Sequence, residues 1–262
     1  AQAGCPFQLG REDNLCQPMT LCFRIGNVDI EKYKESRPLM QRLYKQFQSE
    51  GRIKNPREDV LVFHTLVDGV LHFNTTRVVK LNPTDPLDVT NAEMTAREQM
   101  LEMYNFLHDN VPGFEHSQLL YSASEIGVRE SRMIVGEYVL TEYDLKDCVR
   151  FDDAIAAGNY DIDIHSPDGS GTSHYYFPAG KWYTIPYRSL LPKGADNLLV
   201  AGRCISATHA AQASIRIMPI VTTLGEAAGV AAAIAAKAGV GVKHADVQAI
   251  RAQLEKEGAF LG

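Results

Sequence analysis

The sequence predicts a mixed α+β fold followed by an α/β element. Three patterns indicate it: β-rich runs around an Asp-Gly turn, capped amphipathic helices, and a short apolar run leading into a long Ala/Gly-rich helix. The first two patterns occupy residues 17–187, and the third occupies residues 188–240. A short helix over residues 246–257 closes the chain.

The first strand and helix are predicted from local patterns. Residues 20–25 are rich in β-formers and predict a strand. Asp29 is suited to cap a helix whose apolar side continues to Phe47 and which Gly51 ends. Pro38 lies inside this pattern, so it predicts a kink or a restart of the helix.

Residues 60–79 predict a β-hairpin. The apolar runs VLVFHTLV and VLHFNTTRV flank Asp68-Gly69, the dipeptide favoured in two-residue hairpin turns. Residues 158–192 are rich in Pro, Gly, Asp and Ser, which predicts irregular structure with short strands. Further strand candidates are residues 119–124 and 133–140.

Two capping patterns predict helix starts in the same region. Thr90 and Glu93 match a capping box that opens a helix through Leu107. Thr141 and Asp144 resemble a second helix cap.

The bulk composition excludes several functional classes. The net charge of -6 argues against nucleic-acid and anionic-membrane partners. Five cysteines with no CxxC pair argue against a disulfide framework or a zinc ribbon, and we expect no metal site. They favour a reducing, cytoplasmic location, although a periplasmic one is also compatible. Residues 217–242 form an apolar run, but Ala and Gly dominate it and Glu226 interrupts it, so we expect no membrane span.

The remaining chain is predicted to be organised around residues 197–239. Residues 198–201 have the length of a buried strand, Gly202 and Arg203 break the run, and a helix starts near Pro219 after an irregular polar segment. A strand, a glycine, a loop and a helix N-terminus in that order can bind an anionic cofactor. The same pattern also fits an ordinary buried strand and core helix.

Five segments together carry a family resemblance: QPMTLCFRIGNVD (17–29), HFNTTRV (72–78), GVRESRMIVGEYVLT (127–141), DIDIHSPDG (161–169) and IPYRSLLPKGADNLLVAGRCISATH (185–209). They resemble the FAD-dependent oxidoreductases of the glutathione-reductase-like flavoprotein superfamily. The resemblance implies a flavoenzyme in which residues 1–16 are a remnant of the FAD-binding domain, 17–187 are the α+β substrate (cap) domain, and 188–262 are the C-terminal segment of the Rossmann-like FAD-binding domain.

The chain departs from this family in one respect. It has no GxGxxG motif, and the nearest match, residues 169–174, follows no apolar strand and opens no helix. The chain therefore looks like the C-terminal portion of a longer protein whose Rossmann portion would be its partner. FAD is the implied cofactor of the parent protein, and whether this chain alone binds FAD stays open. Loss of the Rossmann strands would uncover residues 198–201, so we also expect oligomerisation or rearrangement there.

The resemblance places the flavin ring at the start of the Ala/Gly-rich helix. When a flavin accepts a hydride, negative charge develops at its N1/C2-carbonyl edge, which a helix N-terminus favours. The backbone of Ile217, Met218 and Pro219 is expected to face that edge. Arg216 would add positive charge nearby.

Further residues are expected near the ribityl-phosphate region. Gly202 and Arg203 match the Gly-Arg turn of such flavoproteins, and Ser206 would donate a hydrogen bond. The alternative for Arg203 and Arg216 is a surface or interdomain salt bridge.

Candidate catalytic residues are histidines and arginines. His209 and His165 could remove a substrate hydroxyl proton, and His174 is a weaker candidate. Arg129 and Arg132 could bind a carboxylate or FAD phosphate. The alternative for these arginines is an ion-pair cluster with Glu125, Glu130 and Glu137.

Two functions of different classes follow. The first is part of an FAD-dependent oxidoreductase that transfers a hydride between a small organic substrate and flavin. The second is a catalytically inert domain that binds a ligand or a partner and cannot hold FAD alone. A hydrolase is disfavoured, because the chain has no GxSxG elbow and no HExxH helix.

Overall fold

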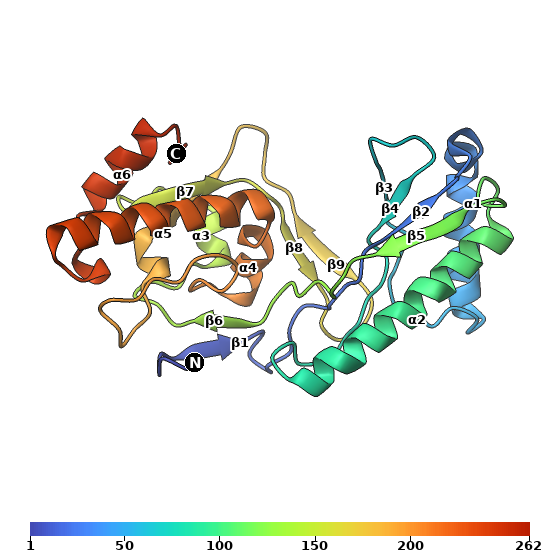
Figure 1. The fold of residues 1–262 in the computed structure, drawn as a ribbon, viewed down its shortest axis with the longest axis horizontal. Helices are drawn as coiled ribbons and strands as arrows, with labels where there is room; N and C mark the ends of the chain where they lie inside the picture. The colour runs from blue at the N-terminus through green and yellow to red at the C-terminus, as the bar shows by residue number, and fades with distance from the viewer. The chain divides into compact units, whose positions relative to one another are not determined.

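The computed structural model describes residues 1–262, and the chain divides into two compact units (Figure 1). Unit 1 comprises residues 1–16, 129–164 and 172–262, and unit 2 comprises residues 17–128 and 165–171. Both units combine helices with small sheets, so the predicted α+β fold class is confirmed. These units are defined by compactness, and the functional domains expected over 1–16, 17–187 and 188–262 stay a prediction.

Unit 2 contains a four-stranded antiparallel sheet and two long helices. The strand order is β3-β4-β2-β5. Alternate strand residues such as Phe23 and Phe73 are buried in one core with residues of both helices. The elements are β2 (Phe23–Gly26), α1 (Ile30–Ser49), β3 (Val62–His64), β4 (Leu71–Phe73), α2 (Pro86–Asn110) and β5 (Gln118–Ser122).

Helix α1 begins where the sequence predicts. Asp29 accepts a hydrogen bond from Lys32 N and caps the helix. Gly51, with a φ of +70°, follows the C-cap. The helix runs through Pro38 as one element, so no restart occurs there. The buried side chains of Tyr33 and Met40 on either side of Pro38 hold both halves in the core.

The predicted hairpin is present, but its turn is longer than expected. The pairing of β3 with β4 ends at His64 and Leu71, which leaves residues 65–70 as the connection. Thr65 closes this loop, because its hydroxyl donates to Val70 O at 2.9 Å. The two-residue turn expected from Asp68-Gly69 was therefore wrong.

Helix α2 starts earlier than its predicted capping box. Asp85 caps the helix, with its carboxylate accepting from Leu87 N and Asp88 N, and Pro86 occupies the first turn. Thr90 lies inside the helix, where its hydroxyl donates to Pro86 O. The predicted capping box was wrong because Asp85 and Pro86 begin the helix upstream, so that the N–H groups after Thr90 lie inside the helix and need no cap.

Unit 1 is built from two-stranded sheets and helices. The sheets are β1-β6, β7-β10 and β8-β9. The capping box of Thr141 and Asp144 is confirmed at the start of α3, and Asp246 caps α6. The elements are β1 (Phe7–Leu9), β6 (Arg132–Ile134), α3 (Glu142–Lys146), β7 (Ala154–Gly158), β8 (Ile162–His165), β9 (Thr172–Tyr175), β10 (Tyr183–Pro186), η1 (Tyr187–Leu190), α4 (His209–Ile215), α5 (Met218–Ala238), η2 (Val242–His244) and α6 (Val247–Lys256).

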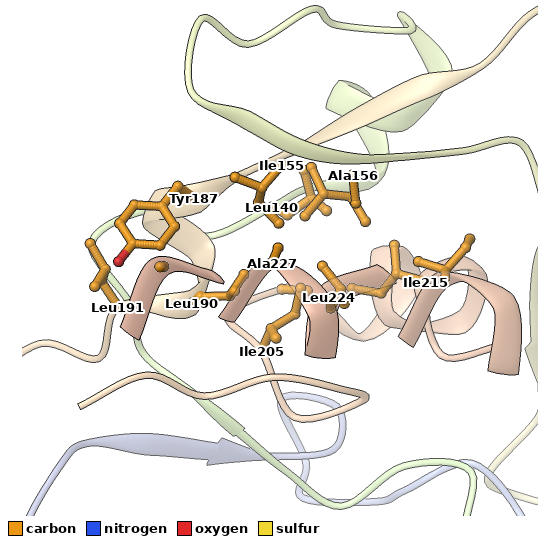
Figure 2. Packing of buried hydrophobic residues seen from close by; sticks show 14 of the residues in the cluster. Leu140, Ile155, Ala156, Tyr187, Leu190, Leu191, Ile205, Ile215, Leu224 and Ala227 are labelled. Carbon is orange, nitrogen blue, oxygen red and sulfur yellow. The ribbon is translucent and has the colours of Figure 1, made fainter. Parts of the chain in front are cut away.

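Helix α5 is the centre of the unit 1 core. Figure 2 shows Leu224 and Ala227 of this helix among Ile155, Ala156 and Ile205. Its alanines allow a close approach to β7, because a small side chain keeps the two backbones near each other. The predicted start near Pro219 is confirmed. By length and a mean hydropathy of 1.5 alone, Met218–Ala238 could cross a membrane, and 28% of that apolar window is buried in the protein.

Residues 198–201 form no strand. They are half-buried, and Val200 N donates to Leu190 O at 2.9 Å. The strand prediction was wrong because this apolar run lies beside η1 and not beside a partner strand. The strand predicted over residues 133–140 is likewise restricted to β6 and two isolated bridges further on. The segment predicted to be irregular before Pro219 contains helix α4.

Candidate functional site

A cavity of about 400 Å³ lies at the N-terminus of α5 in unit 1. Ile217, Pro219 and Ile220 line it together with Gly158 and Tyr160. Ile217 is the N-cap residue, and no side chain caps this end of the helix. The first N–H groups of α5 therefore have no partner within the helix, and together they favour negative charge. Met218, also expected here, is 81% exposed at the first position of the helix.

Arg216 lies directly before this helix and is largely buried. Its Nη2 is 3.6 Å from Oδ2 of Asp163, an ion pair that is largely buried within unit 1 and is therefore not the surface or interdomain salt bridge considered as an alternative. Burial lowers the pKa of Arg216, and the Asp163 carboxylate opposes this effect. The buried Nε of Arg216 has no hydrogen-bond partner. The site therefore keeps an unused donor next to its ion pair.

Tyr160 supplies a neutral phenol to the same cavity. Burial raises the pKa of Tyr160, and the nearby Asp163 carboxylate raises it further. A chain of hydrogen bonds positions its backbone, because Ser214 Oγ donates to Tyr160 O at 2.5 Å and lies 2.6 Å from the Tyr183 hydroxyl. Since the Ser214 proton is used on Tyr160, Tyr183 is the donor to Ser214.

The residues expected near the ribityl phosphate differ in accessibility. Gly202 has a φ of +93°, and a Cβ added there would meet no heavy atom within 4 Å. Arg203 is exposed beside it. Ser206 is completely buried, and its Oγ accepts from Gly136 N at 2.9 Å. The Gly-Arg turn is thus open to a ligand, whereas the Ser206 hydroxyl is part of the interior.

Helix α4 links several predicted residues. Thr208 caps it and His209 begins it. Nδ1 of His209 lies 2.8 Å from Oε1 of Glu130. The side-chain amide of Gln212 donates to Arg129 O at 2.8 Å and to Arg203 O at 3.5 Å. The structure therefore brings His209, Arg129 and Arg203 together around one helix.

Arg132 and His174 lie elsewhere in unit 1. The Arg132 guanidinium is 5.3 Å from the centroid of the Phe7 ring and forms no ion pair, so the expected cluster with glutamates does not include it. His174 Nε2 is 3.7 Å from Asp163 Oδ1, and its ring stacks on Tyr176.

His165, the last residue of β8, belongs to unit 2, whereas the rest of that strand belongs to unit 1. It is buried, and its Nδ1 lies 2.9 Å from Nη2 of Arg77. Arginine has only donors, so Nδ1 must be the unprotonated acceptor and the neutral ring carries its proton on Nε2. Arg77 also donates to the carbonyls of Gly169 and Gly171. This contact set positions the imidazole.

Three residues of the site were missed by sequence reasoning. Tyr160 was passed over because it lies in a loop-rich segment with no motif. Gln212 carried a usable signal, since it is a polar residue between two alanines and proves to be completely buried. Glu130 was considered only as an ion-pair partner of Arg129 and Arg132, and not as the partner of His209. No group of three or more His, Cys, Asp or Glu residues is arranged to hold a metal ion.

Comparison with known proteins supplies the family. The family model described as FAD dependent oxidoreductase matches residues 1–254. Searches of curated proteins and of solved structures gave no match. Because the match covers nearly the whole sequence, the chain belongs to the FAD dependent oxidoreductase family.

Proposed function

We propose that this chain forms the part of a flavin-dependent enzyme that meets the isoalloxazine ring, and that the enzyme transfers a hydride between a small organic substrate and FAD. Family membership supports a flavin oxidoreductase role. The observation that carries the finer proposal is the cavity at the uncapped N-terminus of α5, the helix that Arg216 directly precedes.

The residues present fit the pyrimidine edge of a flavin. The free N–H groups at the start of α5 supply donors to the cavity. Arg216 does not line the cavity, but it directly precedes the N-cap residue and would add positive charge nearby. The open space at Gly202 admits a ligand close to the backbone. Bound FAD would supply the hydride acceptor. The part played by the chain is to stabilise negative charge at the helix N-terminus.

His209 is proposed as the group that accepts a proton from a substrate hydroxyl. With Nδ1–H directed at the Glu130 carboxylate, Nε2 is left as the basic nitrogen. Glu130 would act as a positioning residue that fixes this tautomer. Arg129 and Arg132 remain proposed carboxylate or phosphate ligands.

The ADP part of FAD requires a different site. Residues 169–174 span the connection between β8 and β9 and the start of β9, and no helix begins there. We therefore propose that a glycine-rich Rossmann unit of the glutathione-reductase-like type, outside residues 1–262, binds the ADP. A cytoplasmic location and homo-oligomerisation are part of the same proposal.

Flavin content tests the proposal directly. We expect the protein expressed from the complete open reading frame to purify with flavin absorbance or to take it up when FAD is added. A colourless protein that takes up no FAD would overturn the proposal. Calorimetry of the 262-residue chain with FAD addresses the second function, because binding with a micromolar or lower Kd would contradict an inert domain.

A further inference from the structure

The cavity at the N-terminus of α5 is lined by two segments of different chemistry. The start of α5 contributes apolar side chains, those of Ile217, Pro219 and Ile220. Residues 157–161, from the end of β7 into the loop that follows, contribute one aromatic side chain, Tyr160, of which 37% is exposed. An aromatic ring and apolar side chains in one cavity favour a flat aromatic ligand, because the faces of such a ligand can contact both.

Helix α4 fixes the backbone of Tyr160. Ser214 Oγ donates to Tyr160 O at 2.5 Å and accepts from the Tyr183 hydroxyl at 2.6 Å. Ser214 and Tyr183 are both completely buried, so both hydrogen bonds are shielded from water. Hydrogen bonds in such surroundings are stronger than exposed ones. The carbonyl of Tyr160 is therefore held in one position.

Close packing fixes the residues just before Tyr160. A Cβ added to Gly158 would lie 2.7 Å from Cδ1 of Ile220 and 2.8 Å from the Tyr183 hydroxyl oxygen. The backbone at Gly158 is thus in close contact with side chains of α5 and β10. A side chain that projects from so fixed a backbone loses little entropy when it binds a ligand.

The present inference rests on the proposed flavin site. We propose that Tyr160 contacts a face of the isoalloxazine ring, and that Ser214 is a positioning residue that holds Tyr160 for this contact. The isoalloxazine ring is flat and aromatic, so its faces match the phenol ring and the apolar side chains at the start of α5. The N–H groups of α5 serve the pyrimidine edge of the same ring, so the two roles are separate.

The fluorescence of FAD bound to the parent protein tests this contact. A phenol that touches the excited isoalloxazine donates an electron to it and then takes the electron back, which removes the fluorescence. The ring of phenylalanine is too hard to oxidise to do so. Tyr160→Phe should therefore raise the fluorescence of bound FAD about threefold or more, with a change in Kd of less than about twofold. Tyr160→Ala should weaken FAD binding about tenfold, because the contact with the ring face is lost.

Tyr143→Phe is the matched control for Tyr160→Phe. Tyr143 lies on α3, is exposed and does not line the α5 cavity. Removal of its hydroxyl should change neither the fluorescence nor the Kd of bound FAD.

Ser214→Ala tests the positioning role. It should raise the fluorescence of bound FAD about twofold, because Tyr160 is no longer held in one position. Tyr183→Phe is its control, since this variant removes the hydroxyl that donates to Ser214 but keeps the hydrogen bond from Ser214 to Tyr160 O. A role in stability alone would lower the free energy of unfolding of both variants and leave the fluorescence of both unchanged.

Three results would overturn the proposal. Bound FAD with the same fluorescence in Tyr160→Phe, Tyr143→Phe and the wild type would exclude the ring contact and leave the proposed flavin site intact. Equal fluorescence of Ser214→Ala and Tyr183→Phe would exclude the positioning role. A wild-type parent protein that binds no FAD would overturn the proposed function and this inference with it.

Discussion

Nδ1 of His209 lies 2.8 Å from Oε1 of Glu130, a side chain with 0% exposure. A buried carboxylate is stable in a protein only when it is paired and hydrogen-bonded. Glu130→Ala should therefore lower the free energy of unfolding by about 3 kcal/mol, since it removes the partner of a largely buried imidazole and leaves a cavity. Urea unfolding followed by circular dichroism measures the change.

Glu130→Gln is the matched variant. Its amide oxygen still accepts from His209 Nδ1, so we expect less than half the loss seen with Glu130→Ala. In the flavin-loaded parent protein, the same variant should lower turnover, because a neutral amide fixes the His209 tautomer less firmly than the carboxylate does. Equal free energies of unfolding for both variants and the wild type would show that the Glu130–His209 pair does not stabilise the fold.

Gly202 provides a test of backbone conformation. Its φ of +93° is one that residues with a side chain rarely adopt, while the space around Gly202 is open. Gly202→Ala should cost about 1–2 kcal/mol through backbone strain alone. Gly229→Ala is the same change inside α5, where an added Cβ also meets nothing within 4 Å. That variant should stabilise by about 0.5–1 kcal/mol, so thermal unfolding should move in opposite directions for the two.

Stability should fall at alkaline pH because of Cys16. Burial, with a smaller contribution from the Glu130 carboxylate, raises the pKa of Cys16 from 9.0 to about 12. Above pH 9 the unfolded chain loses this proton while the folded chain keeps it, so stability is lost between pH 9 and pH 12. Burial raises the pKa of Tyr187 from 10.0 to about 12, which adds to the effect.

Urea midpoints measured from pH 8 to pH 10.5 check this pH dependence. Cys16→Ala removes one titrating group, so its midpoint should decline less steeply than that of the wild type. A constant wild-type midpoint over this range would contradict the argument.

Arg216 should control the electrostatics of the proposed flavin site. In the flavin-loaded protein, Arg216→Gln should weaken FAD binding about tenfold and lower the reduction potential, because it removes a buried cation near developing negative charge. Lys237→Gln, in the last turn of α5 and exposed, is the control that removes the same charge far along the helix. A reduction potential unchanged by Arg216→Gln would argue against this placement of the ring.

The sequence predicted those elements whose ends carry strong local signals. Asp29 and the box of Thr141 and Asp144 cap helices as expected, because the bonded groups lie within three residues of each other. Residues 198–201 show the limit of such patterns. An apolar run does not specify its partner, and this one lies beside η1 with a single backbone hydrogen bond to Leu190.

One part of the candidate site was predictable because its signal is also local in the sequence. The start of α5 follows from Pro219, a local signal. The contacts of Gln212 with Arg129 and Arg203 join segments far apart in the chain, so no spacing in the sequence reveals them. Tyr160 enters the cavity only because the loop after β7 lies beside α5, a tertiary relationship.

The two backbone hydrogen bonds between Thr20 and Gly127 have a consequence for how the chain tolerates change. Segment 17–128 separates two parts of unit 1 in the sequence, and these hydrogen bonds join its two ends. The segment therefore costs unit 1 about as little loop-closure entropy as a short loop would. Residues can then be exchanged or inserted within it at little entropic cost to the rest of the protein. Evolution can thus remodel this segment while the helix and cavity of unit 1 keep their geometry.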